Sequence, residues 1–487
     1  MTQNDPAVIS APHQPLSETT RFMCASAFLG HDDDIRKKVR TYVADRHHAM
    51  ADNHGLDVVL LARVLDFNDQ KKFRHYLWHG PIGVVCFLVL VLAWFSLTPD
   101  TQPMVLVAGL VAALVLGAAS YRRYMRNHYE YPLRYFTRET FDAETAMNAF
   151  QNSSHKLEDG VLDRELNGNV TVFGGFDPFV GAGGSIGDWS LLIDTRKGSE
   201  GATPSKFAEA DLDAAIALSF QRLPLPDLEI ADRLFVHGVD AASVGLLPDF
   251  FGRPSQSVDE GTMARFRSTD SHLARVYKMV AVSGWGDQVR VSLFYRIILN
   301  GPVLYIENHS RVLQPVWVRY REIDNLVPLK ADKKFGLFIG QVVISPIVCL
   351  IECFGLFAWM RAAAERRELE KAEKERIEEQ ARYNYGCVSS LRESFSTSIY
   401  DHFFEKSDRD LYVKTFQKQF LDAILEFLDS KNVDTSDFRE QRTYIINSGL
   451  IVHGGLQAEA LAVGEEAQAT AGKKDKPKKV KAGGKAA

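Results

Sequence analysis

The residues best suited to bind a ligand lie in a glycine-rich stretch from Phe173 to Trp189. Bare backbone N–H groups are what a phosphate-binding loop requires, and a β-like run from Asn169 to Phe173 precedes the glycines. A second β-like run, Trp189 to Asp194, follows where a helix would be expected, and no Gly-Lys-Ser/Thr sequence is present. Ligand binding and a plain loop between strands therefore both stay open. The ligand-loop candidates are Asp177, Gly181, Gly183, Gly184, Ser185 and Asp188.

Residue types that carry catalysis or bind metals show no recognisable spacing. The histidines near Asp32 to Asp34 match no zinc pattern, and no Ser-His-Asp, Cys-His or paired-carboxylate arrangement stands out. We therefore expect no enzymatic activity, no metal and no cofactor. A hydrolase that acts through Asp177 and Asp188 is the weakest of the hypotheses.

Composition limits the class of protein. The 487 residues exceed one average core, so two or three folded units are expected. Lys and Arg number 57 against 62 Asp and Glu, which gives a net charge of −5 and argues against a nucleic-acid partner. Apolar residues make up 46%, which excludes a mostly disordered chain.

Two apolar runs, Pro81 to Leu97 and Pro103 to Ala119, each have about the length of one bilayer span. The link between them has no Lys or Arg, whereas basic residues flank both outer ends. By the positive-inside rule this pattern predicts a transmembrane hairpin whose flanks face the cytoplasm, in a multi-pass protein of the bacterial inner membrane. Small residues at four-residue intervals predict close helix packing, either within the hairpin or between protomers. They are Gly109, Ala113 and Gly117.

A third apolar run, Phe335 to Met360, is long for one span and contains Pro346. Basic residues flank both ends, so we prefer a re-entrant segment to a single kinked span. Three polar side chains share one helical face, which would either line a water-filled path or pack against other helices. They are Gln341, Ser345 and Glu352.

The chain between the membrane elements predicts a cytoplasmic α+β domain with an antiparallel sheet. Alternating residues from Val276 to Val282, and strand-like runs on both sides of Asn300-Gly301, predict a three-stranded meander with a tight hairpin turn. Ser205 to Leu223 has the pattern of a helix packed against it.

The C-terminal part predicts a charged helical stalk followed by a small helical domain. One apolar face of that domain contains Val413, Phe416, Phe420, Ile424 and Phe427. The expected units are a helical region 1–76, the hairpin 77–120, the α+β domain 121–332, the third membrane segment 333–360, the stalk 361–385, the helical domain 386–455 and a disordered basic tail 456–487.

Several strings resemble an uncharacterised family of actinobacterial multi-span membrane proteins. They are Thr20 to Gly30, the glycine-rich stretch through Asp194, Ser389 to Ser394, and Val433 to Gly449. The resemblance implies a membrane protein and carries no activity.

Together these observations predict a membrane scaffold or signalling protein. Its α+β domain would bind a ligand or partner, and its C-terminal helical domain would recruit others. We expect the lipid bilayer as one partner and a second copy or another protein at the C-terminal helices. The alternative is an oligomeric channel or membrane-disrupting effector gated by the α+β domain, with Glu352 facing the path.

Overall fold

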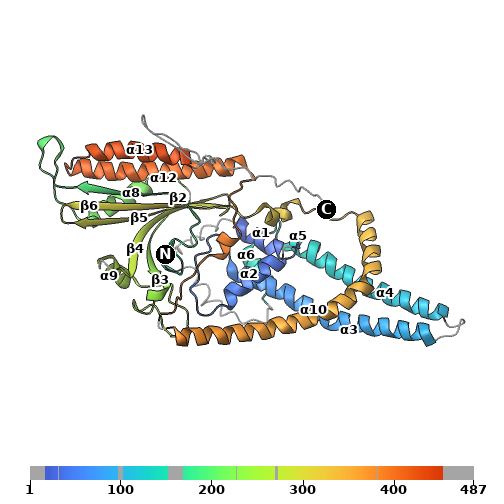
Figure 1. Cartoon of the computed structure of the whole chain (residues 1–487). Helices are drawn as coiled ribbons and strands as arrows, with labels where there is room; N and C mark the ends of the chain where they lie inside the picture. The colour runs from blue at the N-terminus through green and yellow to red at the C-terminus, as the bar shows by residue number, and fades with distance from the viewer. Residues whose placement is uncertain are drawn as a thin grey trace, which may run out of the picture.

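The computed structural model describes residues 17–30, 32–96, 102–151, 168–225, 227–268, 272–380 and 382–452. Figure 1 shows a sheet with its covering helices in one half and a set of long helices extending from the other half. The predicted basic tail, 456–487, lies outside the described residues.

One mixed sheet has the strand order β1-β3-β4-β5-β6-β2 (Figure 1). Its strands are β1 (Val170–Phe173), β2 (Gly184–Asp194), β3 (Glu229–His237), β4 (Ala274–Gly284), β5 (Val289–Asn300) and β6 (Val303–Leu313). β1 runs parallel to β3, while the other neighbouring strands are antiparallel. The predicted α+β class and meander are confirmed. The prediction of a purely antiparallel sheet is wrong, because β1 runs parallel to β3. The long connection between these two strands contains β2.

The sequence predicts the β5–β6 hairpin, but the turn lies one residue further along the chain than predicted. Asn300 pairs with Val303, so the two turn residues are Gly301 and Pro302. Gly301 takes a positive φ of 60°, which a glycine adopts without the penalty that a side chain would bring. Asn300 therefore ends the strand instead of forming the turn.

Four helices cover one face of the sheet and bury its apolar side chains, most of them Val, Leu and Ile. They are α8 (Glu209–Gln221), α9 (Glu260–Ser268), α12 (Phe403–Ser430) and α13 (Ser436–Val452). Phe416 and Phe420 of α12 share a core with Val280, Leu293 and Ile306 of the strands. The predicted apolar face of this helix is confirmed, but it packs on the sheet. A separate helical domain on a stalk is therefore wrong.

The remaining helices form a second core and an extended rod. They are α1 (Glu18–Ser26), α2 (Asp32–Ala44), α3 (Val58–Ser96), α4 (Gln102–Met125), α5 (Tyr131–Tyr135), α6 (Ala143–Ala149), α10 (Ala331–Glu379) and the short α11 (Leu391–Ser394). The core of this half includes Phe22, Leu61, Phe136 and Phe150. α3, α4 and α10 extend from it and pack against one another (Figure 1).

The predicted membrane architecture is wrong. Within the described part of the chain, no helix combines the length and apolar character needed to cross a bilayer. In the described residues, the three apolar runs belong to α3, α4 and α10, with Leu97 of the first run outside the description. Helix α10 continues through Pro346 into the charged stretch as one helix. The re-entrant segment, the transmembrane hairpin and the multi-pass inner-membrane location are overturned together, because all three depend on those spans.

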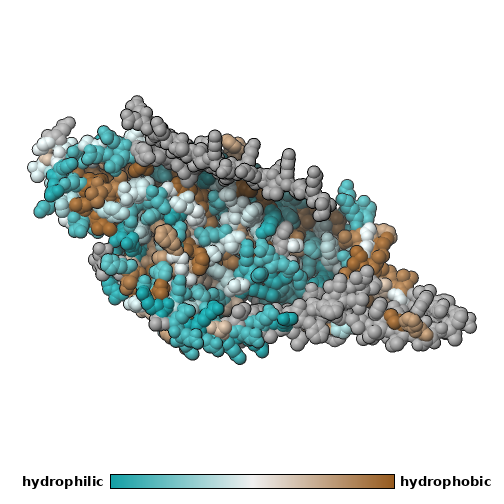
Figure 2. All heavy atoms as spheres, viewed as in Figure 1, coloured by the Kyte–Doolittle hydropathy of each residue, from teal (hydrophilic) through white to brown (hydrophobic). Residues whose placement is uncertain are grey.

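Gly117 of the small-residue stripe of α4 lies against α10. A Cβ atom added at Gly117 would lie 2.5 Å from the Cα atom of Val342, so the two backbones approach closely. Elsewhere α4 carries exposed apolar side chains, among them Met104, Val107 and Val115. Figure 2 shows hydrophobic residues along the described surface of this part of the rod.

Candidate functional site

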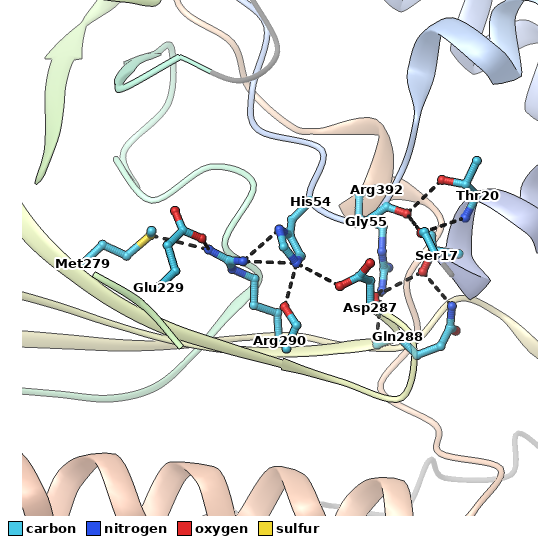
Figure 3. Close-up of polar contacts among 12 residues, drawn as sticks. Ser17, Thr20, His54, Gly55, Glu229, Met279, Asp287, Gln288, Arg290 and Arg392 are labelled. Atoms are coloured by element: carbon cyan, nitrogen blue, oxygen red, sulfur yellow. Dashed lines mark hydrogen bonds and ion pairs between the residues drawn. The ribbon is translucent and has the colours of Figure 1, made fainter. Parts of the chain in front are cut away.

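A partly buried polar cluster joins the helical half to the sheet (Figure 3). His54 comes from the loop before α3, and Ser283 is the last residue but one of β4. Asp287 lies in the following turn and Arg290 lies on β5. The Nε2 atom of His54 is 2.6 Å from the Ser283 hydroxyl and 3.2 Å from an Asp287 carboxylate oxygen. Arg290 Nη1 is 2.8 Å from the Nδ1 atom of His54.

This cluster brings serine, histidine and aspartate together without forming a nucleophile–base pair. A guanidinium can only donate, and Arg290 Nη1 lies nearer to the Nδ1 atom of His54, at 2.8 Å, than to its Nε2 atom, at 3.1 Å, so we assign Nδ1 as the acceptor. The imidazole proton then lies on Nε2 and points toward Asp287 and Ser283. A base for Ser283 would need an unprotonated Nε2, and in a triad the aspartate holds the opposite ring nitrogen. The arrangement therefore holds the loop to the sheet and does not activate the serine.

Ion pairs complete the same cluster. Arg290 donates to Glu229 at 2.7 Å, and Arg233 donates to Asp52 at 3.0 Å. Burial alone would raise the pKa of the Asp52 carboxyl, but Arg233 and the neighbouring cations hold it below its usual value. The cavity beside these residues has a volume of about 20 Å³, which is room for about one water molecule. The cluster therefore connects the loop before α3 to the sheet, and the cavity beside it is too small for a substrate.

Arg392, from the segment that follows α10, fixes that segment to the same cluster (Figure 3). Its side chain is fully buried and donates to the main-chain carbonyls of Asp287 and Gln288 and to the Ser396 hydroxyl. Burial lowers the pKa of Arg392 to about 9, although the Asp287 carboxylate acts in the opposite direction. A buried cation with these partners is a strong structural contact between the two halves.

The glycine-rich loop does present bare backbone N–H groups, and the chain itself supplies the anion. Oε1 of Glu393 accepts from the N–H groups of Gly181 and Gly183, both at 2.9 Å. Both glycines have positive φ values, 96° and 88°, and each lies against another segment's backbone, Gly181 at Asp52 and Gly183 at Val312. The loop is thus a nest for a carboxylate, filled by Glu393.

The acidic candidates of the same loop meet Arg311 of β6. Arg311 is buried and donates to Asp188 at 2.8 Å and to Asp177 at 3.5 Å, with its guanidinium 4.7 Å from the centre of the Phe179 ring. Gly184 and Ser185 begin β2, where Ser185 pairs with Arg311. The structure therefore brings all six loop candidates near Arg311 or Glu393 of the same chain.

Among the other predicted positions, Gln341 lines a cavity of about 240 Å³ where α10 meets α3 and α4. Asn127 and Ser120 line the same cavity. Ser345 and Glu352 belong to α10, but their side chains lie outside the described part of the structure. The polar stripe is therefore described only at Gln341.

The cavity with the volume of a ligand site lies in the sheet itself. β3 and β4 curve away from β5, β6 and β2 (Figure 1). A cleft of about 600 Å³ is lined by residues of β3, β4 and β5. Helices α8 and α9 form its walls, and strands β3, β4 and β5 form its floor. Ligand sites in proteins have volumes of about 300–1,000 Å³, so the cleft is the candidate site.

Lys278 lies at the centre of the cleft, between two carboxylates. Its Nζ atom is 2.6 Å from Asp213 and 3.6 Å from Asp232. Asp213 also accepts from the Tyr295 hydroxyl at 2.9 Å, and burial together with Asp213 raises the pKa of Tyr295 well above its ordinary value. Arg267 of α9 pairs with Asp232 on the other wall. The basic and acidic groups of the cleft are thus paired with one another.

Sequence reasoning missed the cleft, although one signal was present. Lys278 interrupts the apolar side of β4 between Val276 and Val280. A lysine there must either leave the core or meet carboxylates, and the structure shows the second outcome. The carboxylates come from α8 and β3, so no spacing within β4 could have located them.

The structure defines an α+β protein whose mixed sheet opens into a charged cleft. The family model of the AbeC-like domain matches residues 188–458, more than half of the chain, and the chain therefore belongs to the AbeC-like family. No curated protein and no solved structure gives a significant match. Every residue that lines the cleft falls within the matched part, whereas His54 and Asp52 precede it.

Proposed function

We propose that this chain is a non-catalytic binding protein whose α+β half receives a ligand or partner in the cleft between β4 and β5. The observation that carries the proposal is the 600 Å³ cleft at the point where the sheet divides. The cleft combines apolar side chains with paired charges, and fixed polar groups beside apolar surface orient a ligand. The His54 cluster supports binding over catalysis, because its serine has no base.

The test uses two variants that fill the cleft and one that does not. Ala210 of α8 and Ala264 of α9 lie on opposite walls and are exposed. Ala214 is also exposed on α8 but does not line the cleft, so Ala214→Trp is the matched control. Ligand-observed NMR with a fixed library of small organic fragments would be recorded for the full chain and all three variants.

We expect fragments that bind the parent chain and the Ala214→Trp variant to lose their signals with Ala210→Trp and Ala264→Trp. Functional pockets concentrate such binding because they combine apolar area with fixed polar groups. Equal binding by the parent chain and both filled variants would show that the cleft receives nothing, and the proposal would fail.

We further propose that the start of α12 is a protein-docking surface, as expected for the C-terminal helices. Phe403 and Phe404 are 78% and 68% exposed, and Ile399 beside them is also exposed. Adjacent exposed aromatic side chains mark protein interaction sites more often than isolated ones do.

Sedimentation velocity of the full chain should show self-association that the double variant Phe403→Ser, Phe404→Ser reduces. Phe176→Ser, at another exposed phenylalanine, is the control, and equal sedimentation of all three chains would reject association of copies through this surface.

A further inference from the structure

Strand β2 is one of the two outer strands of the sheet. One of its sides pairs with β6, and the register shifts between Ser185 and Gly187. In the part of the chain that the structure describes, no strand pairs with its other side. The regular stretch after the shift, residues Asp188 to Asp194, therefore has one open side, and we name this stretch the β2 edge.

The hairpin between β5 and β6 determines which backbone groups of β2 are already used. Asn300 and Val303 flank a two-residue turn and exchange hydrogen bonds, so Val303 and every second residue after it point their N–H and C=O toward β5. The alternate residues of β6 point theirs toward β2. The β2 residues opposite them, whose backbone groups are therefore used, are Trp189, Leu191 and Ile193.

The other residues of the β2 edge point their backbone groups to the open side. Thr195 continues the alternation beyond the strand, because its N–H donates to the Pro302 carbonyl at 2.8 Å and so points toward β6. Ser190, Leu192 and Asp194 then point outward. Among the described residues, no hydrogen bond reaches the main-chain groups of Ser190 and Leu192 on this side. These groups are available to a second strand.

The side chains of the β2 edge alternate between the core and the surface. Leu191 and Ile193 lie in the core with the covering helices, whereas Leu192 is 68% exposed. An apolar side chain in the middle of an open edge favours pairing with a further strand, and proteins commonly place a charge or a proline there to prevent it. Asp188 and Asp194 lie at the two ends of the edge, on the same face as Leu192. This face is therefore apolar at its centre and acidic at its ends.

One end of the β2 edge also carries a cation. The guanidinium of Arg196, two residues beyond the edge, donates to both carboxylate oxygens of Asp194, at 3.0 and 2.8 Å, and its side chain is exposed. At the other end, Asp188 accepts from Arg311 through Oδ1, which leaves Oδ2 to accept from a second cation. The edge therefore has an acid at one end and an acid–arginine pair at the other.

This distribution suits two antiparallel copies of the β2 edge. Residues that point outward must face one another, and in the register centred on Leu192 this residue faces Leu192 of the second copy. Ser190 then faces Asp194. Asp188 lies diagonal to Asp194 and its bound Arg196, within reach of a long side chain. Every exposed group of the edge thus meets a complementary group.

The neighbouring registers lack this match. Centring the pair on Leu191 would place Asp188 directly opposite Asp194, and two like charges in that position destabilise a strand pair. Centring it on Ile193 would place Leu192 opposite Asp194, where the leucine gains no apolar neighbour. The side chains therefore favour the register centred on Leu192.

We propose that the β2 edge binds the β2 edge of a second copy of this chain, antiparallel and centred on Leu192. The two sheets then form one continuous sheet across a two-fold axis, and each copy uses the same residues. Main-chain hydrogen bonds hold the strands together, the two leucines bury each other, and the charges at the ends fix the register. The cleft is lined by β3, β4 and β5, so this dimer leaves it open, and the inference goes beyond the proposed function.

The first test is oxidative cross-linking of full chains that carry one added cysteine, with the parent chain as the background for its own five cysteines. Leu192→Cys places the new thiol at the two-fold axis, where the Cα atoms of a hydrogen-bonded pair lie about 5.5 Å apart, a distance that a disulfide spans. Ser190→Cys is the matched control, because its two copies would lie about 14 Å apart. A mixture of Ser190→Cys and Asp194→Cys chains should cross-link again, because these positions face each other.

We expect the covalent dimer to form at least about tenfold faster with Leu192→Cys than with Ser190→Cys or the parent chain, since only the first pair of thiols meets the geometry of a disulfide. Equal rates for Leu192→Cys and Ser190→Cys would overturn the proposal, because random collision or another register would then explain the cross-link.

Sedimentation velocity tests the dimer without an added cysteine. The parent chain should sediment as a dimer, and Leu192→Lys should raise its dissociation constant by about tenfold, since it places two like charges at the axis. Leu218→Lys, at an exposed leucine of α8, is the matched control and should leave the dimer unchanged. A monomeric parent chain would overturn the proposal. A dimer that Phe403→Ser, Phe404→Ser abolishes and Leu192→Lys leaves intact would overturn it as well, in favour of the surface on α12.

Discussion

Replacing Glu393 by alanine should release the glycine-rich loop from the segment after α10. Oε1 of Glu393 accepts two backbone N–H groups at 2.9 Å, from Gly181 and Gly183, and Oε2 accepts the N–H of Ser390 at 3.2 Å. In the Glu393→Ala variant the two glycine N–H groups lose their acceptor. The loop should then open more often while the rest of the sheet stays closed.

The size of the effect follows from the two glycine bonds. A hydrogen bond to a charged acceptor contributes about 1.5–3 kcal/mol, and neighbouring bonds to one acceptor do not add fully. We therefore assign about 3 kcal/mol to the pair, which corresponds to about 100-fold faster amide exchange at Gly181 and Gly183. Glu393→Gln keeps an oxygen for these N–H groups but loses the charge, so its exchange should rise by only about tenfold.

The assay is hydrogen–deuterium exchange of the full chain, with fragmentation that resolves single amides of the loop. Amides of β5 are the internal reference, and Glu368→Ala, on the exposed surface of α10, is the control variant. The reasoning is refuted if Glu393→Ala changes loop exchange less than threefold. It is also refuted if Glu393→Gln accelerates exchange as much as Glu393→Ala, because the carboxylate charge would then contribute nothing.

Two further predictions concern helix packing and pH. Gly117→Ala should lower the denaturation midpoint by an amount equivalent to about 1–3 kcal/mol, because the new Cβ meets Val342 of α10, whereas Gly340→Ala has open space and should leave the midpoint unchanged or raise it. The hydrogen bond to Asp45 raises the pKa of His48, so this contact stabilises the fold fully below pH 6.5 and is lost as pH rises through the higher folded pKa. Denaturation midpoints measured across this window should fall for the parent chain, and His48→Gln should flatten that fall; a parallel fall in both chains would contradict the assignment.

The parts of the fold that the sequence predicts are those with a local period. Val276 to Val282 alternate as a strand must, and the spacing of Phe416 and Phe420 matches a helix face. Both patterns place apolar groups on one side, and both sides are buried in one core. The pattern of one segment does not tell which other segment packs against that side. The α12 face was therefore expected to meet other helices, and it meets the sheet.

The apolar runs show the same limit in another form. A run such as Pro103 to Ala119 reports apolar side chains and not what surrounds them. In the structure this run belongs to a helix whose Gly117 lies against Val342 of α10, a segment more than 200 residues away in the sequence. The small residues predict close packing within the hairpin or between protomers, and Gly117 lies against α10 instead. The partner helix of Gly117 could not be predicted, because three helices contain similarly apolar runs.

The segment after α10 is the clearest case in which side-chain patterns carry no signal. Arg392 donates to the carbonyls of Asp287 and Gln288, and Glu393 accepts from the N–H groups of the glycine-rich loop. Apart from the Ser396 hydroxyl, which also accepts from Arg392, these partner atoms belong to the backbone, which every residue type supplies. A search for complementary charges would look for an acid opposite Arg392 and a base opposite Glu393. The fold instead satisfies two opposite charges, adjacent in sequence, with two separate pieces of main chain. For that reason the glycines predict an anion from outside the chain. In the structure, their N–H groups instead donate to the carboxylate of Glu393.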